Sequence, residues 1–253
     1  MAVDEAILQA VGRGDSLPTL RLYAWQPACL SLGQAQSIKD VDPARLKARG
    51  WGVVRRLTGG RAILHTDELT YSVIAPPAEP RVQGSVLESY SRLARALLAA
   101  VRALGLPVEM EPNAAPSAQA GGPVCFEVPS AYEIVSGGKK LIGSAQARKR
   151  DGVLQHGSLP LHGDLTRITQ ALVYPDEAAR EAAARSLLEH ATTLETAGGR
   201  VVPWENAAQA FVDAFETELD LSIERSELSL AEKTQAEELV LKKYDHPDWT
   251  ERS

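Results

Sequence analysis

The chain has 253 residues, of which 44% are hydrophobic and 24% are charged, which suits a globular protein with one sizeable core or two small ones. Its formal net charge of −6 argues against nucleic acid as a general partner, although local basic patches are compatible with it. No apolar run approaches the roughly 18 residues of a bilayer-spanning helix, and the N-terminus lacks the basic region of a signal peptide, so no membrane partner is expected.

The first part of the chain predicts a short helix, several strands and a long helix. Strands are expected at 20–25, 28–33, 52–57, 62–64 and 69–74. Of these, 28–33 is expected to pair with 20–25. Helices are expected at 3–12, 43–49 and 86–104. The second helix follows Asp42 and has Pro43 at its first helical position, a favourable start.

The second part of the chain predicts a mobile loop over 111–122, then hairpins, then helices. The expected strands are 125–128, 132–135, 140–146 and 152–158, with turns at 136–139 and 150–152. The expected helices are near 176–190, 205–219 and 229–243. This order predicts an α+β fold with a mixed, mainly antiparallel sheet flanked by helices. We expect a single catalytic domain over 1–253, with a helical C-terminal portion from about 164.

The stretch from Arg55 to His65 (RRLTGGRAILH) has two adjacent glycines, three arginines and a histidine. Glycine admits a positive φ and lets a ligand approach the main chain closely. Arginines beside such a turn can bind a carboxylate, a phosphate or an acidic protein surface. A tight hairpin with solvated arginines fits the spacing equally well, and a lone histidine is more often structural than catalytic. The stretch is neither a P-loop nor a GxGxxG motif.

The chain has two cysteines, Cys29 and Cys125, and no CxxC motif or His/Cys cluster that would indicate a metal site. A lone cysteine is most often a small buried core residue. Without a secretion signal a disulfide is not expected. We therefore expect a reduced, cytoplasmic protein without a metal.

Cys125 follows the expected loop and begins an expected strand, which favours exposure. A reactive cysteine needs a positive neighbour because the thiolate is the nucleophile. A hairpin over 136–138 would bring Lys140 near the preceding strand, although a solvated hairpin lysine fits as well. One face of the strand would then form a polar pocket wall: Lys140, Ile142, Ser144 and Gln146.

These stretches resemble the lipoate–protein ligase and octanoyltransferase superfamily. The resemblance is carried by the stretch from Arg55 to His65, ELTYS over 68–72, PVCFEVPSAYE over 123–133 and GKKLIGSAQ over 138–146. It implies a biotin/lipoyl-ligase-like fold in which the glycine turn lines the pocket for a lipoyl or octanoyl chain. ATP-using ligases commonly have a third glycine at Arg61 and an Asp at Thr66. The difference at Arg61 makes the chain more similar to the octanoyltransferase branch, whereas the difference at Thr66 does not discriminate, because Asp67 offers a carboxylate nearby.

In that branch a cysteine carries the acyl group as a thioester and a lysine lowers the pKa of that cysteine. The resemblance assigns these roles to Cys125 and Lys140. It implies the following substrate-binding residues: Arg56, Thr58, Gly59, Gly60, Arg61, His65, Gly143, Ser144, Gln146, His156 and Gly157. Members of the family usually carry a further strand ahead of the first helix, whereas this sequence begins almost at that helix. Loss of that strand would expose a sheet edge.

The resemblance implies octanoyl-acyl carrier protein as donor and the lysine of an apo lipoyl domain, such as glycine-cleavage H protein, as acceptor. No cofactor is then needed. The arginines of 148–150, or Arg92, Arg95 and Arg102, are candidates for docking these acidic proteins. Three alternatives stay open: an ATP- and Mg-dependent lipoate or octanoate ligase, an amidotransferase between lipoyl domains, and a non-catalytic protein that binds lipoyl domains.

Overall fold

Within the residues that the structure describes, the main sheet has six antiparallel strands in the order β1-β5-β9-β8-β7-β6. The computed structural model describes residues 1–111 and 133–252. The strands of this sheet are β1 (Thr19–Tyr23), β5 (Glu68–Ala75), β6 (Glu109–Glu111), β7 (Glu133–Ser136), β8 (Lys139–Lys149) and β9 (Gly152–Pro160). The central strands β5 and β9 are buried along nearly their whole length, as expected when both faces of a sheet are covered.

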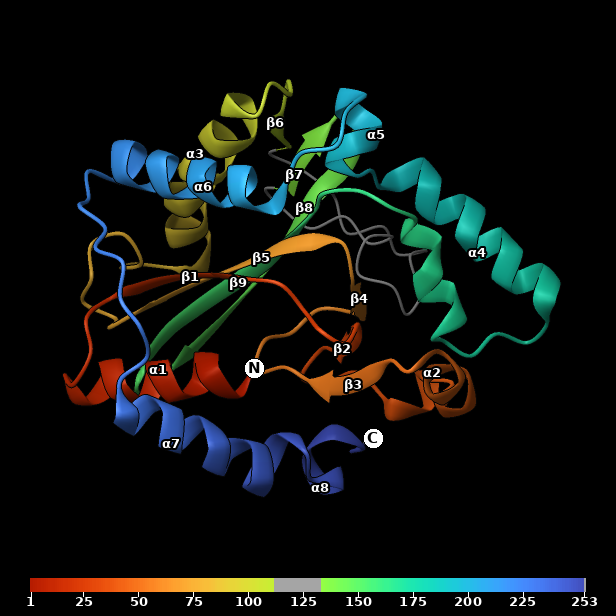
Figure 1. The fold of residues 1–253 in the computed structure, drawn as a ribbon, viewed down its shortest axis with the longest axis horizontal. Helices are drawn as coiled ribbons and strands as arrows, with labels where there is room; N and C mark the ends of the chain where they lie inside the picture. Colours follow the sequence, from red (N-terminus) through yellow and green to blue (C-terminus); the bar gives the residue numbers. More distant parts are fainter. Residues whose placement is uncertain (112–132, 253) are drawn as a thin grey trace.

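Alternation along the central strands separates the two faces of this sheet. Leu69 and Tyr71 of β5 belong to the core under α3 (Val86–Ala103) and α6 (Trp204–Leu219). Ile74 of β5 and Leu154 of β9 belong to the core under α1 (Ala2–Arg13). Figure 1 shows α3 and α6 on one side of the sheet, with α1 and α7 (Leu230–Leu239) on the other. The main sheet is therefore the middle layer of three.

A second sheet has three strands in the order β3-β2-β4. Its strands are β2 (Cys29–Leu32), β3 (Gly52–Arg55) and β4 (Ile63–His65). β2 is parallel to β3 and antiparallel to β4. The expected pairing of 20–25 with 28–33 is therefore wrong, since β1 pairs with β5. The physical reason is burial: Leu20 and Leu22 pack on the core under α3 and α6, whereas Leu30 and Leu32 lie in a separate core beside α2.

The connection between β3 and β4 is not a tight hairpin, so that alternative is also wrong. β3 and β4 lie on opposite sides of β2, and the glycine turn crosses the end of β2. The backbone N–H of Arg56 donates to the carbonyl of Leu32, and the N–H of Gln34 donates to the carbonyl of Thr58. The turn is thus attached to the loop after β2, which places it against the main sheet.

The predicted helices agree well with the structure because their caps are local. α2 (Pro43–Arg49) is capped by the side chain of Asp42 and ends at Gly50 in the left-handed region. α3 starts with a capping box between Ser85 and Glu88. The described residues also contain α4 (Glu177–His190), α5 (Leu194–Gly198) and α8 (Pro247–Thr250). Shorter turns are the 3-10 helices at Ile38–Asp40 and Leu165–Gln170 and a π-helical turn at Val240–Tyr244. None of the helices in the described residues is both long and apolar enough to cross a bilayer.

Leu97 and Leu87 of α3 offer a matched test of this packing. Leu97 is fully buried against the main sheet, whereas Leu87 is 52% exposed. We expect Leu97→Ala to lower the free energy of unfolding by about 3 kcal/mol, because it leaves a cavity. Leu87→Ala should cost about 0.5 kcal/mol or less. Urea denaturation measures both, and equal losses would contradict the three-layer packing.

Candidate active site

A cavity of about 390 Å³ lies between the main sheet and the glycine turn, within the usual size range of small-molecule sites. It is lined by Met1, Ser31, Arg56, Gly59, Gly60, Arg61, Ile63, His65, Thr70, Lys140, Gly143, Ser144, Ala145, Gln146, His156, Gly157 and Ser158. Every predicted substrate-binding residue is in this set except Thr58, which contacts His156 beneath it. Cys125 lies outside the described residues. The structure thus brings the described candidates to one place, and their role in binding stays a prediction.

Arg56 holds the glycine turn in shape. Its guanidinium donates to the carbonyl oxygens of Gly59 and Arg61, each at 2.8 Å, and to the carbonyl of Ser31 at 3.1 Å. Gly60 has φ 92°, a left-handed conformation that favours glycine. A Cβ at Gly33 would lie 1.8 Å from the carbonyl oxygen of Gly60, so the two backbones touch. Arg56 therefore stabilises the conformation of the glycine turn.

His65 belongs to a buried array of a hydroxyl, an imidazole and a carboxylate. Its Nε2 lies 2.7 Å from Oγ of Ser31, and its Nδ1 lies 2.6 Å from Oε1 of Glu68. Oγ of Ser31 also accepts from Arg56 at 3.2 Å, so the hydroxyl links the imidazole of His65 to the guanidinium of Arg56. The opposite nitrogen of the ring faces Glu68. Trp25 stacks on the imidazole with ring centroids 4.2 Å apart.

Glu68 is the buried carboxylate of this array. Burial alone would raise the pKa of Glu68, but the charge of His65 and hydrogen bonds from His65, Thr70 and Ser158 bring that pKa below its ordinary value. The hydroxyls of Thr70 and Ser158 donate to Oε1 at 2.5 and 2.9 Å. Glu68 is thus held as a carboxylate inside the protein.

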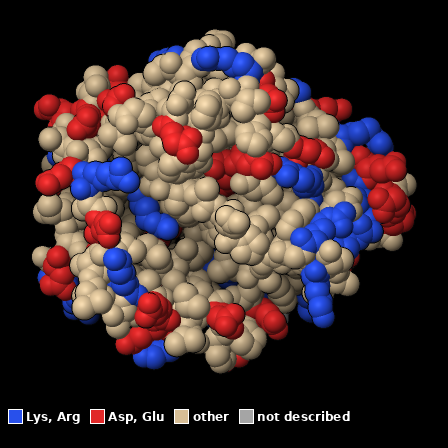
Figure 2. Space-filling view, in the orientation of Figure 1, with Lys and Arg blue, Asp and Glu red and all other residues tan. Residues whose placement is uncertain are grey.

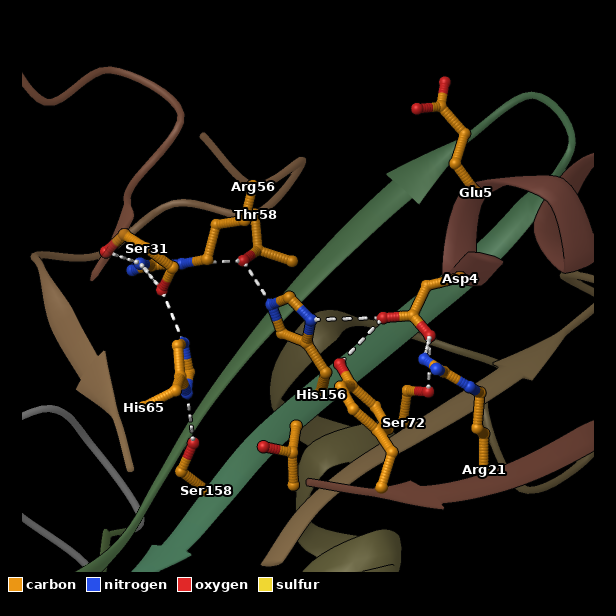
Figure 3. Close-up of polar contacts among 12 residues, drawn as sticks. Asp4, Glu5, Arg21, Ser31, Arg56, Thr58, His65, Ser72, His156 and Ser158 are labelled. Atoms are coloured by element: carbon orange, nitrogen blue, oxygen red, sulfur yellow. Dashed lines mark hydrogen bonds and ion pairs between the residues drawn. The ribbon is translucent and has the colours of Figure 1, made fainter. Parts of the chain in front are cut away.

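His156 belongs to a second array of the same kind, and Figure 3 shows the two arrays meeting at Arg56. Nε2 of His156 lies 2.7 Å from Oγ1 of Thr58, which accepts from Nε of Arg56. Nδ1 of His156 lies 4.0 Å from Oδ2 of Asp4. Burial lowers the pKa of His156, although Asp4 opposes the shift, so the imidazole is neutral at neutral pH.

Asp4 was not predicted as a site residue. Its carboxylate accepts from Arg21 at 2.7 Å, Tyr23 at 3.0 Å and Ser72 at 3.1 Å. Burial would raise the pKa of Asp4, but nearby positive charges and a hydrogen bond with His156 hold it well below its usual range. The sequence signal that could have revealed it is an acid within the apolar face of the first helix, where Asp4 is 1% exposed.

The polar side chains around the cavity are therefore bonded largely to one another. Both nitrogens of His65 face partners within the protein, and those of His156 face Thr58 and Asp4. The surface that the lining presents to the cavity is mostly apolar. A cavity of this kind can accept an acyl chain without leaving a buried polar group unpaired.

Lys140 reaches the cavity wall from β8 and is 5% exposed. Its Nζ lies 2.5 Å from Oε1 of Glu133, which is also buried. The expected hairpin over 136–138 is confirmed, because Val135 of β7 faces Lys140. The alternative of a solvated lysine is wrong. The backbone carbonyl of Lys140 also accepts from the N–H of Thr192, which fixes this end of the strand.

The family profile described as the lipoyl protein ligase A/B catalytic domain matches residues 1–216. The chain belongs to this family. The octanoyltransferase LipM of Kyrpidia tusciae is 42% identical over 261 residues, covering 100% of this chain and 93% of the relative. The octanoyltransferase LipM of Moorella thermoacetica is 44% identical over 261 residues, with coverage of 100% and 93%.

Solved structures of this family have the same fold. A bipartite lipoate protein ligase of Thermoplasma acidophilum matches with a TM-score of 0.81 at 25% identity, over 99% of this chain and 89% of that chain. A lipoate-protein ligase A bound with ATP matches with a TM-score of 0.78 at 24% identity, over 99% and 92%. The predicted α+β fold with a mainly antiparallel sheet flanked by helices is confirmed.

The family lysine does not share a face with all the residues expected beside it. Ile142 lies in the core under α3 and α6, and Ser144 on the same face bonds to the hydroxyl of Tyr71 at 2.7 Å. Gln146 donates to Oε1 of Gln155 and Oγ of Ser89. The register shifts between Ile134 and Val135, opposite Lys140–Ile142, and this irregularity interrupts the alternation. Lys140, Ser144 and Gln146 all line the cavity as expected, and the expected row is interrupted at Ile142.

Cys29 is unsuited to be the nucleophile of a family member. Burial raises the pKa of its thiol to about 12, so Cys29 is a thiol at neutral pH. It lies in β2, where Gly52 is its neighbour in β3. Cys125 lies outside the described residues, and its covalent role stays a prediction. Within the described part of the chain, no group of three His, Cys, Asp or Glu side chains is arranged to hold a metal ion.

The pKa of His156 predicts how stability depends on pH. Below the unfolded-state pKa of about 6.5, the unfolded chain binds a proton that the native imidazole does not. Stability therefore falls as pH drops from about 6.5 towards the lower native pKa of His156, by up to about 1.4 kcal/mol per pH unit.

Urea denaturation at about pH 7.5 and 5.5 measures this slope. His156→Gln should reduce the slope, because no imidazole then gains a proton on unfolding at this site. His190→Gln is the matched control, since His190 is exposed, and it should keep the slope of the wild type. Equal slopes for the wild type and His156→Gln would contradict the neutral, buried state of His156.

Proposed function

We propose that the protein is an octanoyltransferase that moves an octanoyl group from octanoyl-acyl carrier protein to the lysine of an apo lipoyl domain. The acyl group would pass through a thioester on Cys125. The observation that supports this best is an apolar cavity with a buried, ion-paired lysine at its wall, in a chain whose relatives over its full length are named octanoyltransferases.

The reaction has two half-reactions. In the first, the Cys125 thiolate attacks the carbonyl carbon of the donor thioester, and the carrier leaves as a thiolate that takes up a proton. In the second, the neutral amine of the acceptor lysine attacks the Cys125 thioester. The Cys125 thiolate leaves, the amine proton is released, and an amide forms. Thioester exchange is close to neutral in energy and amide formation from a thioester is downhill, so no ATP is required.

Lys140 has the electrostatic role in both half-reactions. Its positive charge would stabilise the Cys125 thiolate and the oxyanion of each tetrahedral intermediate. Glu133 balances this charge in the absence of substrate, because the two groups form an ion pair at 2.5 Å. A buried ammonium without such a partner would favour its neutral form.

The cavity would hold the octanoyl chain. Burial of its methylene groups contributes up to about 0.8 kcal/mol each. Arg56 and Thr58 would shape the wall, and the backbone of Gly59 and Gly60 would allow the chain to approach closely. Arg61, His65, Gly143, Ser144, Gln146, His156 and Gly157 would complete the contact surface. We propose a single domain over 1–253 for this task, active in the cytoplasm and without a cofactor.

Most of the arginines that are candidates for docking acidic proteins form hydrogen bonds within the chain. Arg148 donates to the carbonyls of Val82 and Ser85, Arg92 donates to the carbonyl of Arg81, and Arg102 donates to that of Val108. Figure 2 shows acidic and basic side chains mixed over one face of the molecule. Glycine-cleavage H protein stays the proposed acceptor, and its docking surface is not assigned to these arginines.

Intact-mass measurement after incubation with octanoyl-acyl carrier protein tests the covalent step. We expect a mass increase of one octanoyl group, removed on addition of an apo lipoyl domain. Cys125→Ser should show no adduct, and Cys29→Ser should show it in full. Formation of octanoyl-adenylate from ATP and octanoate without an adduct would instead support a ligase. An adduct formed only from an octanoylated lipoyl domain would support the amidotransferase.

Glu133→Gln tests the buried ion pair. Removal of the carboxylate leaves the Lys140 ammonium buried without this partner, so we expect a loss of about 3 kcal/mol in the free energy of unfolding. The rate of octanoyl transfer should fall at least about tenfold, because the Lys140 ammonium loses the carboxylate that fixes its position at the cavity wall. Urea denaturation and the transfer assay measure the two effects.

Glu238→Gln is the matched control for Glu133→Gln. Glu238 pairs with Lys242 at 2.6 Å, but both side chains are largely exposed. This change should cost about 0.5 kcal/mol or less and leave the transfer rate unaltered. A Glu133→Gln enzyme with wild-type stability and rate would show that the pair has no part in the reaction.

A further inference from the structure

Arg55 is a buried bridge between the loop after β2 and the end of α8. Its side chain is fully buried, and within the described residues it donates to six backbone carbonyl oxygens. On one side it donates to Gly33 at 2.9 Å, Gln34 at 3.3 Å and Gln36 at 2.5 Å. On the other side it donates to the carbonyls of Trp249 at 2.9 Å, Thr250 at 3.0 Å and Arg252 at 2.7 Å. The contacts use all the nitrogen atoms of the guanidinium.

The loop that Arg55 holds is also the support of the glycine turn. The N–H of Gln34 donates to the carbonyl of Thr58 at 2.9 Å, and the backbone of Gly33 touches the carbonyl of Gly60. Arg252 donates to the carbonyl of Gln34 at 2.6 Å. The end of α8 is thus joined through Arg55 and one loop to the wall of the cavity.

A second set of contacts joins residues 243–249 to α1. Trp249 donates from its indole nitrogen to the carbonyl of Arg55 at 2.9 Å, and Nζ of Lys243 lies 4.1 Å from a ring centroid of Trp249. Lys243 also binds both carboxylate oxygens of Glu5 at 2.8 Å, and Tyr244 donates to Glu5 at 2.6 Å. Glu5 is the neighbour of Asp4, the carboxylate beside His156. Figure 3 shows Asp4 pointing into the arrays and Glu5 pointing away from them.

Residues 240–252 therefore contact the supports of the cavity on two sides, which are the loop behind the glycine turn and the first turn of α1. Figure 1 shows α7 beside α1 and α8 near β3. Residues 240–252 lie beyond residue 216, where the match to the family profile ends. A catalytic domain that ended at residue 216 would lack both sets of contacts.

We propose that residues 240–252 are a positioning element of the acyl pocket, acting through Arg55 on the glycine turn and through Glu5 on the first turn of α1. The proposal rests on the proposed function for the identity of the ligand, but its structural part does not depend on that identity. Arg55 and Trp249 are positioning residues, because they act on the cavity only through the loop and the turn.

Hydrogen–deuterium exchange of the free full-length protein tests the structural part. In Trp249→Phe, which keeps an aromatic ring but loses the N–H donor, amides of the peptide over 55–62 should exchange about tenfold faster than in the wild type. Arg55→Lys should have a larger effect, because one ammonium cannot bind six carbonyls. Unchanged exchange over 55–62 in both variants would overturn the proposal, whether or not the protein transfers octanoyl groups.

Arg81→Lys is the matched control. Arg81 also bridges to backbone carbonyls, donating to Leu219 at 3.1 Å and Asp220 at 2.7 Å, but it contributes nothing to the cavity lining. In this variant exchange should rise near 219–221 and stay unchanged over 55–62. Faster exchange over 55–62 in Arg81→Lys would show a general loss of stability and would overturn the proposal.

The kinetic test uses octanoyl-acyl carrier protein as substrate and octanoic acid as a binding probe. Trp249→Phe should raise KM for the donor and weaken octanoic acid binding by about tenfold, while kcat changes less than about threefold. The proposal would be overturned if Trp249→Phe and Arg81→Lys lowered kcat and the affinity for octanoic acid to the same extent. Failure of the wild type to transfer octanoyl groups would overturn the proposed function alone, since the exchange experiment still decides the positioning role.

Discussion

Arg56 is the group on which the geometry of the cavity depends. Its N–H groups donate to carbonyls of the glycine turn. Through Ser31 and Thr58 they also order the imidazoles of His65 and His156, each of which has a carboxylate on its far side. Buried polar groups are stable only when they are paired, so each member of the two arrays is retained by its neighbours. The turn, the helix α1 and the strands β5 and β9 are thereby held in one arrangement around the cavity.

This pairing explains how a wall made largely of polar residues can accept an apolar chain. The polar atoms of Arg56, His65 and His156 are bonded within the protein, so what they present to the cavity is mostly carbon. Lys140 is different, because it carries a charged group that forms a buried ion pair with Glu133. The contrast separates a wall that presents mostly carbon to the cavity from a buried charged pair at its edge.

Local patterns predicted the helices closely and the strands well, because caps, apolar spacing and turn glycines act over a few residues. The capping box of α3 and the capped, proline-led start of α2 are examples. The pairing between strands was harder to predict from these local patterns. β1 and β2 follow one another in the chain but belong to different sheets, since their leucines are buried in separate cores. The glycine turn likewise crosses the end of β2, which no short pattern reveals.

The sequence by itself determined the family, the α+β class and the candidate residues, because the motifs around Gly59 and Lys140 are contiguous stretches. Only the tertiary structure decided what these residues contact. Arg55 and Arg56 are adjacent and of the same residue type, yet one binds carbonyls of residues 249–252 and the other orders the glycine turn. Asp4 and Glu133 became visible as partners of His156 and Lys140 only through contacts. Long-range burial and pairing produce these differences, and no local pattern of charge or hydrophobicity encodes them.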